Sequence, residues 1–137
     1  MSFVTVLLKC CKLTDEELTR SHAYSESNYQ AALSHFLQKE LSDDFTVSRE
    51  VHIPYRLSDG FVYGSGRADI ICEDRAERNC YILELKANVD GRVLKKYYGQ
   101  LSRYTKHHPC EYKKTGVVVL FNSNSEPTVK VHYPIKK

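Results

Sequence analysis

The sequence predicts an α/β domain in which a mixed β-sheet is flanked by helices. Residues 25–41 repeat apolar side chains at helical spacing, and residues 45–87 alternate short apolar runs with turn signals. A second helical pattern at 93–107 precedes the most hydrophobic run of the chain, 116–121. This order of elements is typical of α/β folds. Because 137 residues with 42% hydrophobic side chains suffice for one core, we expect residues 1–137 to form a single domain.

The first helix is predicted over residues 25–41, with Ser25 as its N-cap and Glu26 in its first turn. Its apolar stripe consists of Tyr29, Leu33, Phe36, Leu37 and Leu41. Upstream, the sequence from Thr14 to Glu17 has the form of a capping box and predicts a short helical turn. Residues 1–21 are otherwise interpreted as an N-terminal extension, either an extra edge strand or a partner-binding arm.

Strands joined as hairpins are predicted in the middle of the chain. Residues 45–55 alternate and stop near a proline, and the turn signal Ser58-Asp59-Gly60 follows. Further strand segments are predicted at 62–66, 68–72 and 80–87. The glycines of the 62–66 segment do not open a helix and are not followed by a GK[ST] sequence, so a nucleotide-binding loop is not expected.

A crossover helix is predicted over residues 93–107, closed by Pro109. It leads to the apolar run 116–121, which reads as a buried strand beside the 80–87 strand. Residues 128–133 alternate as a last, edge strand. The stripe of the crossover helix consists of Leu94, Tyr97, Leu101 and Tyr104.

The cysteines and the N-terminus indicate a cytoplasmic or nuclear protein. The five cysteines include no CxxC pair, so reduced thiols are expected. Cys110 with His107 and His108 offers ligands for a soft metal but no fourth ligand at zinc-site spacing, and we expect no structural zinc. The apolar start at residues 3–8 is too short to span a bilayer, so no membrane association is expected.

Positive charge is concentrated in the C-terminal part of the chain. Residues 1–84 carry 9 Lys and Arg against 14 Asp and Glu, whereas residues 85–137 carry 11 against 3. This basic part is a candidate surface for a polyanion, although a solvated face without a partner has the same composition. On the crossover helix the candidate nucleic-acid-binding residues are Lys95, Lys96, Arg103 and Tyr104, with the alternative that Tyr104 belongs to the core.

Acidic residues at two strand positions predict a metal site. Glu84 and Lys86 lie two residues apart in an apolar strand and therefore project from the same face. If Asp69 lies on a neighbouring strand, the two carboxylates form an oxygen site that suits Mg²⁺ or Mn²⁺ held beside a substrate phosphate. Charges without partners are costly in a buried strand, which favours a functional role over a solvated pair.

The order of these elements resembles the PD-(D/E)XK nuclease superfamily over residues 22–121. Within it the sequence is most similar to the small GxxExxY family, whose first-helix motif corresponds to residues 23–29, with Ala23 in place of the glycine. The later elements of that family correspond to Asp69, to Glu84-Leu85-Lys86 and to the Gln-x-x-x-Tyr sequence at 100–104.

This resemblance implies a restriction-endonuclease-like core and a Mg²⁺-dependent (or Mn²⁺-dependent) deoxyribonuclease. It implies that Asp69 and Glu84, with the Leu85 carbonyl, hold the metal, and that Lys86 binds the attacking water or the scissile phosphate. It further implies that Glu26 is an accessory acid and that Gln100 orients the phosphate or the water. Stabilisation of a helix N-terminus is the alternative role of Glu26, and a partly exposed amide is the alternative for Gln100.

Three other functions stay open at this point. A Holliday-junction resolvase of the same superfamily has a similar set of residues and acts as a homodimer. A catalytically silent nucleic-acid-binding module would keep the sheet and the basic helix but not the acidic site. An enzyme that acts on RNA is not excluded by any residue. The expected partner is nucleic acid, with DNA preferred.

Overall fold

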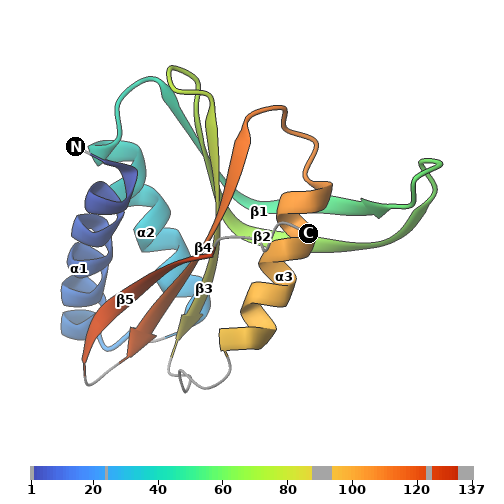
Figure 1. Ribbon diagram of the computed structural model, residues 1–137. Helices are drawn as coiled ribbons and strands as arrows, with labels where there is room; N and C mark the ends of the chain where they lie inside the picture. The colour runs from blue at the N-terminus through green and yellow to red at the C-terminus, as the bar shows by residue number, and fades with distance from the viewer. Residues whose placement is uncertain (1, 24, 88–93, 123–124, 133–137) are drawn as a thin grey trace.

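The computed structural model describes residues 2–23, 25–87, 94–122 and 125–132. Three helices and five strands lie in these ranges: α1 (Phe3–Ser21), α2 (Glu26–Glu40), β1 (Phe45–Arg56), β2 (Val62–Asp74), β3 (Asn79–Ala87), α3 (Leu94–His107), β4 (Lys113–Asn122) and β5 (Ser125–His132). The strands form one sheet in the order β1-β2-β3-β4-β5. The pairs β1–β2, β2–β3 and β4–β5 are antiparallel, and β3–β4 is parallel. The predicted mixed sheet with flanking helices is therefore confirmed (Figure 1).

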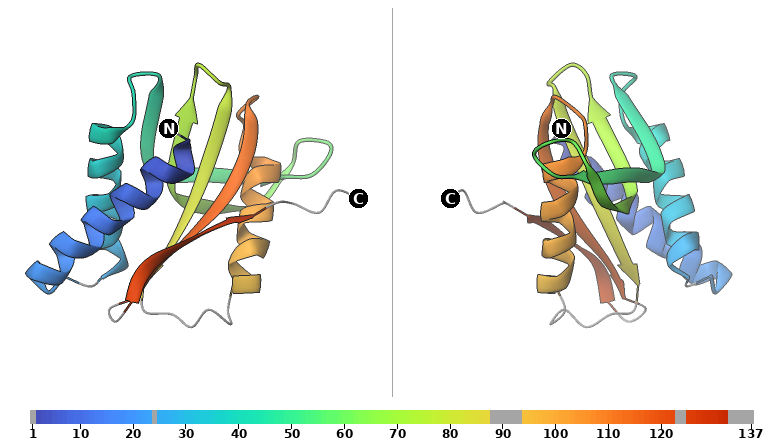
Figure 2. Two further views of the ribbon diagram at one scale, coloured as in Figure 1. Left: turned by 60° about the vertical axis from the view of Figure 1, so that its left-hand side comes forward. Right: turned by 90° about the vertical axis from the view of Figure 1, so that its right-hand side faces the viewer.

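The helices cover both faces of the sheet (Figure 2). Each face has its own hydrophobic core. On one face α1 and α2 pack against strand residues that include Leu83 and Leu85. On the other face α3 packs against residues that include Ile82 and Val118. Successive side chains of β3 thus alternate between the two cores, as the strand pleat requires.

The edge-strand alternative for the N-terminal segment is wrong, because Phe3–Ser21 form the 19-residue helix α1. The helix begins at Phe3, where the Ser2 hydroxyl accepts a hydrogen bond from the Thr5 N–H. Its apolar positions Phe3, Leu7, Cys10 and Cys11 are buried in the core shared with α2. Thr14, predicted to cap a short turn, is fully buried within the helix and donates its hydroxyl proton to the Cys10 carbonyl at 2.8 Å.

The β1–β2 hairpin changes direction where Glu50 faces Asp69. Glu50 has a φ of 50°, in the left-handed region that only a few per cent of non-glycine residues adopt. Before this point Val47 packs with the core of α1 and α2, whereas Val51 beyond it packs with the core of α3. β2 is one continuous strand across this bend, whereas the sequence predicted two segments (Figure 1). The bend ends the β2–β3 pairing, whose last pair is Ile70 with Leu83.

The remaining elements follow the predicted order. The strand at β4 and the crossover helix α3 lie where the sequence places them, and β5 is an edge strand as expected. Val93 and Tyr133, which were included in the predicted ranges, fall outside the described residues. Among the helices that the structure describes, none has both the length and the apolar character needed to cross a membrane.

Candidate active site

Asp69 is held at the point where β2 leaves β3. Its Oδ2 accepts a hydrogen bond of 2.7 Å from the Leu85 backbone N–H, in place of the strand partner that the bend removes. The Gln30 side chain of α2 donates to the Asp69 backbone carbonyl at 3.0 Å and lies 3.5 Å from Oδ1. Gln30 in turn accepts from Arg49 at 3.3 Å. The Asp69 carboxylate is therefore positioned by two neighbouring elements before any ligand binds.

Glu84 and Lys86 lie on the face of β3 that is covered by α3. Glu84 is only 4% exposed, and its Oε1 lies 3.3 Å from the Lys86 ammonium. The ammonium is also 5.0 Å from the ring centroid of Tyr97, a residue of α3. Glu84 Oε2 is buried and has no hydrogen-bond partner among the residues that the structure describes. Burying a carboxylate oxygen without a hydrogen-bond donor costs free energy, and a bound cation or proton would remove that cost.

The electrostatics of the site favour a bound cation. Burial raises the pKa of Glu84 to about 7, and the negative charge of Asp69 adds to this effect. Burial also raises the pKa of Asp69, although the hydrogen bond from Leu85 opposes it. Burial disfavours the charged form of Lys86, but the charges of Glu84 and Glu26 outweigh it and the pKa of Lys86 is raised. Since the donors are carboxylate oxygens that repel one another, the set fits a hard divalent cation such as Mg²⁺ or Mn²⁺.

A pocket of about 190 Å³ opens beside Asp69. It is lined by Glu26, Ser27, Gln30, Glu50, Asp69 and Leu85. Glu26 accepts a hydrogen bond of 3.3 Å from the Ala87 N–H, so this first-turn acid of α2 reaches the end of β3. Glu50 was not identified as a candidate from the sequence, because it lies in an alternating strand segment and no motif marks it. Its position opposite Asp69 follows from the bend, which only the fold reveals.

The candidates on α3 divide into an exposed and a buried group. Lys95, Lys96 and Arg103 are exposed. Tyr104 is 3% exposed and donates its hydroxyl proton to the Arg67 carbonyl at 3.1 Å. Its ring has no face available to a base, so its assignment to nucleic-acid binding is wrong and the alternative, a core role, holds. Gln100 is half-buried between Tyr97 and Tyr104 along the helix, and its Oε1 is a second buried oxygen without a partner in the described part of the chain.

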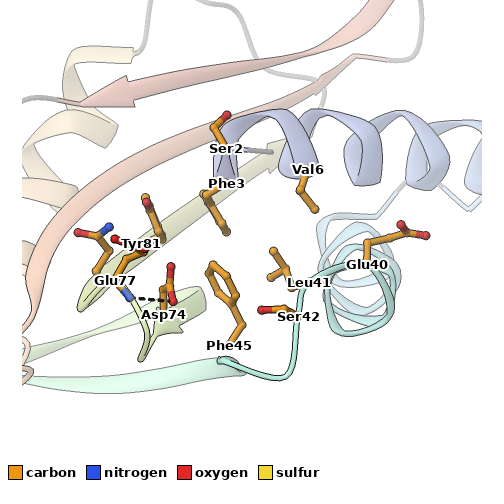
Figure 3. Close-up of a pocket in the computed structure, with 11 residues that line it drawn as sticks. Ser2, Phe3, Val6, Glu40, Leu41, Ser42, Phe45, Asp74, Glu77 and Tyr81 are labelled. Atoms are coloured by element: carbon orange, nitrogen blue, oxygen red, sulfur yellow. Dashed lines mark hydrogen bonds between the residues drawn. The ribbon is translucent and has the colours of Figure 1, made fainter.

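A larger pocket, of about 430 Å³, lies elsewhere, between the N-terminus of α1, the end of α2 and the β2–β3 turn (Figure 3). Phe3 stacks on both Phe45 and Tyr81 along its wall. One of its lining acids, Asp74, accepts hydrogen bonds from the Ala76 and Glu77 N–H groups and thereby closes the turn. None of the candidate catalytic residues lines it, and we assign it no catalytic role.

The comparisons with known proteins agree with this fold. A family model of the PD-(D/E)XK nuclease superfamily matches residues 6–132. Among solved structures, the crystal structure of SSO0001 aligns with 97% of this chain over 67% of the SSO0001 chain, at 24% sequence identity and a TM-score of 0.51. The structure of NucC of P. aeruginosa ATCC27853, in its cAAA-bound form, aligns with 79% of this chain over 52% of the NucC chain, at 11% sequence identity and a TM-score of 0.47. The comparison with curated proteins returns no match. The family match and the fold shared with SSO0001 confirm the predicted restriction-endonuclease-like class.

Proposed function

Because the chain belongs to the PD-(D/E)XK nuclease superfamily, we propose that it is a metal-dependent nuclease that hydrolyses phosphodiester bonds of DNA. The observation that carries the proposal is the buried Glu84 carboxylate, which has one oxygen beside Lys86 and one without a partner in the described residues. A module that only binds nucleic acid has no need of a carboxylate in such an environment. Placement within the small GxxExxY family is part of the same proposal.

In this proposal Asp69, Glu84 and the Leu85 carbonyl hold one or two Mg²⁺ or Mn²⁺ ions. When bound, such an ion neutralises charge on the phosphate and lowers the pKa of a water. The chain itself contributes two carboxylates that are held in place before the metal binds. Asp69 is held by hydrogen bonds from Leu85 and Gln30, and Glu84 is held by its place in β3. Because these groups need little rearrangement on binding, less binding energy is lost in reorganising the site.

Lys86 is proposed to donate a hydrogen bond to the attacking water or to the scissile phosphate. Its ammonium stays protonated at neutral pH, because the pKa is raised by the surrounding carboxylates. Tyr97 restricts where the ammonium lies through the cation–π contact. Glu26 is proposed as an accessory acid on the α2 side, and Gln100 as a group that orients water or phosphate from the α3 side.

The DNA backbone is proposed to lie along the exposed cations of α3. Lys95, Lys96 and Arg103 share this helix with Tyr97, which contacts Lys86. A phosphate chain held by these side chains would therefore run past Lys86 and Glu84, whose side chains lie on the α3 face of the sheet. DNA rather than RNA is proposed from the resemblance alone, so the test compares both.

The experiment is a cleavage assay of the purified chain on labelled duplex DNA, a four-way DNA junction and RNA, each with Mg²⁺, Mn²⁺ or EDTA. The proposal predicts cleavage of duplex DNA that needs the metal and is lost in Glu84→Gln. Symmetric cuts confined to the junction, with a dimer in solution, would identify a resolvase instead. Cleavage of RNA alone would overturn the DNA assignment. Binding without cleavage of any substrate would identify a silent module.

A further inference from the structure

A second cluster of metal-binding side chains lies at the other end of β3 from Glu84. It consists of Glu73, Cys80, His108 and Cys110, whose ligand atoms all lie within 4.8 Å of one another. Glu73 at the end of β2 and Cys80 at the start of β3 are paired across the hairpin. His108 and Cys110 come from the segment that follows α3. From Cys80 to Glu84 is four residues along β3, or about 13 Å, so this cluster is separate from the candidate active site.

The imidazole of His108 lacks the hydrogen bonds that a buried histidine normally makes. Neither ring nitrogen has a hydrogen-bond partner in the described part of the chain, and the side chain is 10% exposed. Its Nε2 lies 3.7 Å from Glu73 Oε1, which is too long for a hydrogen bond. Cys80 beside it is fully buried. Two buried ring nitrogens without hydrogen-bond partners, next to a buried thiol and a carboxylate, are an arrangement that a metal ion would satisfy.

The neighbouring residue, His107, differs from His108 because its ring nitrogens already have partners. His107 accepts a hydrogen bond from the Arg56 N–H at 3.1 Å and lies 3.4 Å from the Tyr63 hydroxyl, so its ring is already used to hold the β1–β2 hairpin. The sequence suggested His107, His108 and Cys110 as a group that lacked a fourth ligand. The fold replaces His107 with Cys80 and Glu73, which lie about thirty residues earlier in the chain and at no recognisable zinc-site spacing.

We propose that Glu73, Cys80, His108 and Cys110 bind one Zn²⁺ ion that ties the end of α3 to the β2–β3 hairpin. Two thiolates, one imidazole and one carboxylate are ligands that tetrahedral zinc accepts, with bonds of about 2.0–2.3 Å. Those bonds put the ligand atoms roughly 3.3–3.8 Å apart. The ligand atoms here lie within 4.8 Å of one another, so movements of about 1 Å by the side chains would complete the site. All four positions are filled by protein, as in structural zinc sites, and the ion has no part in hydrolysis.

The zinc ion would stabilise the candidate active site indirectly, by fixing the position of α3. This helix carries Tyr97, which contacts Lys86, and Gln100 one turn later. His108 directly follows the helix, and its N–H bonds to the Tyr104 carbonyl, so fixing His108 fixes the last turn. We therefore expect zinc to stabilise the protein without being required by the cleavage chemistry.

The test uses the full chain, purified under reducing conditions, stripped with EDTA and titrated with Zn²⁺ and with Co²⁺ as a spectroscopic substitute. The proposal predicts one zinc per chain, a rise in Tm on zinc addition, and an absorption band from thiolate-to-cobalt charge transfer. That band requires cysteine ligands, so it distinguishes this cluster from the carboxylates at Asp69 and Glu84. Glu84→Gln should keep the band, whatever its effect on cleavage.

Matched variants complete the test. Cys80→Ala, Cys110→Ala and His108→Ala should weaken zinc binding by about 100-fold or more, because each loses a direct ligand. Cys72→Ala removes an equally buried thiol on the neighbouring strand, with its side chain in the other core, and should bind zinc as the parent does. His107→Ala should do the same. If Cys80→Ala does not fold, Cys110→Ala is compared with the parent instead, because Cys110 is only half-buried.

Three results would overturn the proposal. The first is reduced parent protein that binds no zinc, and the second is zinc binding that survives in Cys110→Ala and His108→Ala. The third is a Cys80–Cys110 disulfide in protein purified without reductant, identified by mass spectrometry of its peptides, which would make the pair a redox bond and not a metal site.

Discussion

Asp69 Oδ2 accepts a 2.7 Å hydrogen bond from the Leu85 N–H at the place where β2 stops pairing with β3. The same carboxylate is a proposed metal ligand, so one side chain both completes the sheet and forms the site. In most sheets the next residue of the partner strand would supply the acceptor. The bend at Glu50 removes that acceptor and leaves room for a pocket beside the carboxylate.

Replacements of Asp69 should separate its two roles. Asp69→Ala leaves the Leu85 N–H without its acceptor and should lower the free energy of unfolding by about 1–3 kcal/mol. Asp69→Asn keeps a side-chain carbonyl and should cost less than about 1 kcal/mol, while both variants lose cleavage activity. Urea unfolding in EDTA measures the difference. Equal stability of the two variants would show that the hydrogen bond contributes nothing.

The stability of the metal-free protein should depend on the ionisation of Glu84. Its pKa is about 7 in the folded protein against an ordinary value of 4.5, so the folded state binds the proton more tightly than the unfolded state. The stabilisation is fully present below pH 4.5, falls as the pH rises toward 7, and is absent above it. The total change is about 3 kcal/mol at most.

Glu84→Gln provides the reference for this pH dependence, because glutamine cannot titrate. Urea unfolding of both proteins in EDTA across this pH range should give a difference that shrinks or reverses as the pH rises. Mg²⁺ should flatten the curve of the parent by favouring the ionised carboxylate. Parallel pH profiles of the two proteins would refute the assignment of a raised pKa to Glu84.

Lys86→Ala should lower the rate of DNA cleavage much more than DNA affinity. The ammonium is proposed to act on the transition state, and loss of such a group typically costs about 10²-fold or more in rate. Single-turnover cleavage and equilibrium binding measure the two effects, with metal binding followed by calorimetry. Cleavage at the parent rate by a folded, metal-loaded Lys86→Ala protein would reduce Lys86 to the ion-pair partner of Glu84.

Neutralising Lys95 and Lys96 together should weaken DNA binding across sequences and flatten its salt dependence. Each lost phosphate contact should reduce the slope of log K against log salt by about 0.9 for duplex DNA. Lys12→Gln with Lys39→Gln is the matched control, because these exposed lysines lie on α1 and α2, the helices of the opposite face. A slope that changes equally in both pairs would mean that α3 is not the DNA-binding helix.

Gly66→Ala should destabilise the outer half of the hairpin. A Cβ at Gly66 would overlap the Tyr55 hydroxyl and lie 2.5 Å from Tyr104 Cε1. Overpacking of this kind costs about 1–3 kcal/mol. Gly64→Ala is the control, since the nearest atom to its Cβ would be 3.6 Å away, an ordinary contact. Thermal unfolding of the two variants should therefore differ, and equal Tm values would contradict the packing of Tyr55 and Tyr104 over Gly66.

Several features of this protein were readable from the sequence because they depend on local pattern. Helical spacing identified α2 and α3, alternation identified β1, and the apolar run from Gly116 to Phe121 identified the interior strand β4. The spacing of Glu84 and Lys86 placed both on one face of a strand. The helix α1 was missed because its apolar residues and its acidic segment were interpreted separately, although together they form one continuous helix.

Tertiary structure alone decided which distant groups meet. The left-handed backbone at Glu50 turns the hairpin, ends the pairing of β2 with β3 and brings Glu50 opposite Asp69. Likewise, Cys80 and Glu73 join His108 and Cys110 only because α3 returns the chain to the β2–β3 hairpin. The sequence by itself determined which residues carry chemistry and which face of an element they occupy, because helical and strand periodicity are local. Contacts between elements depend on how strands bend and helices cross, and those are properties of the whole packed chain.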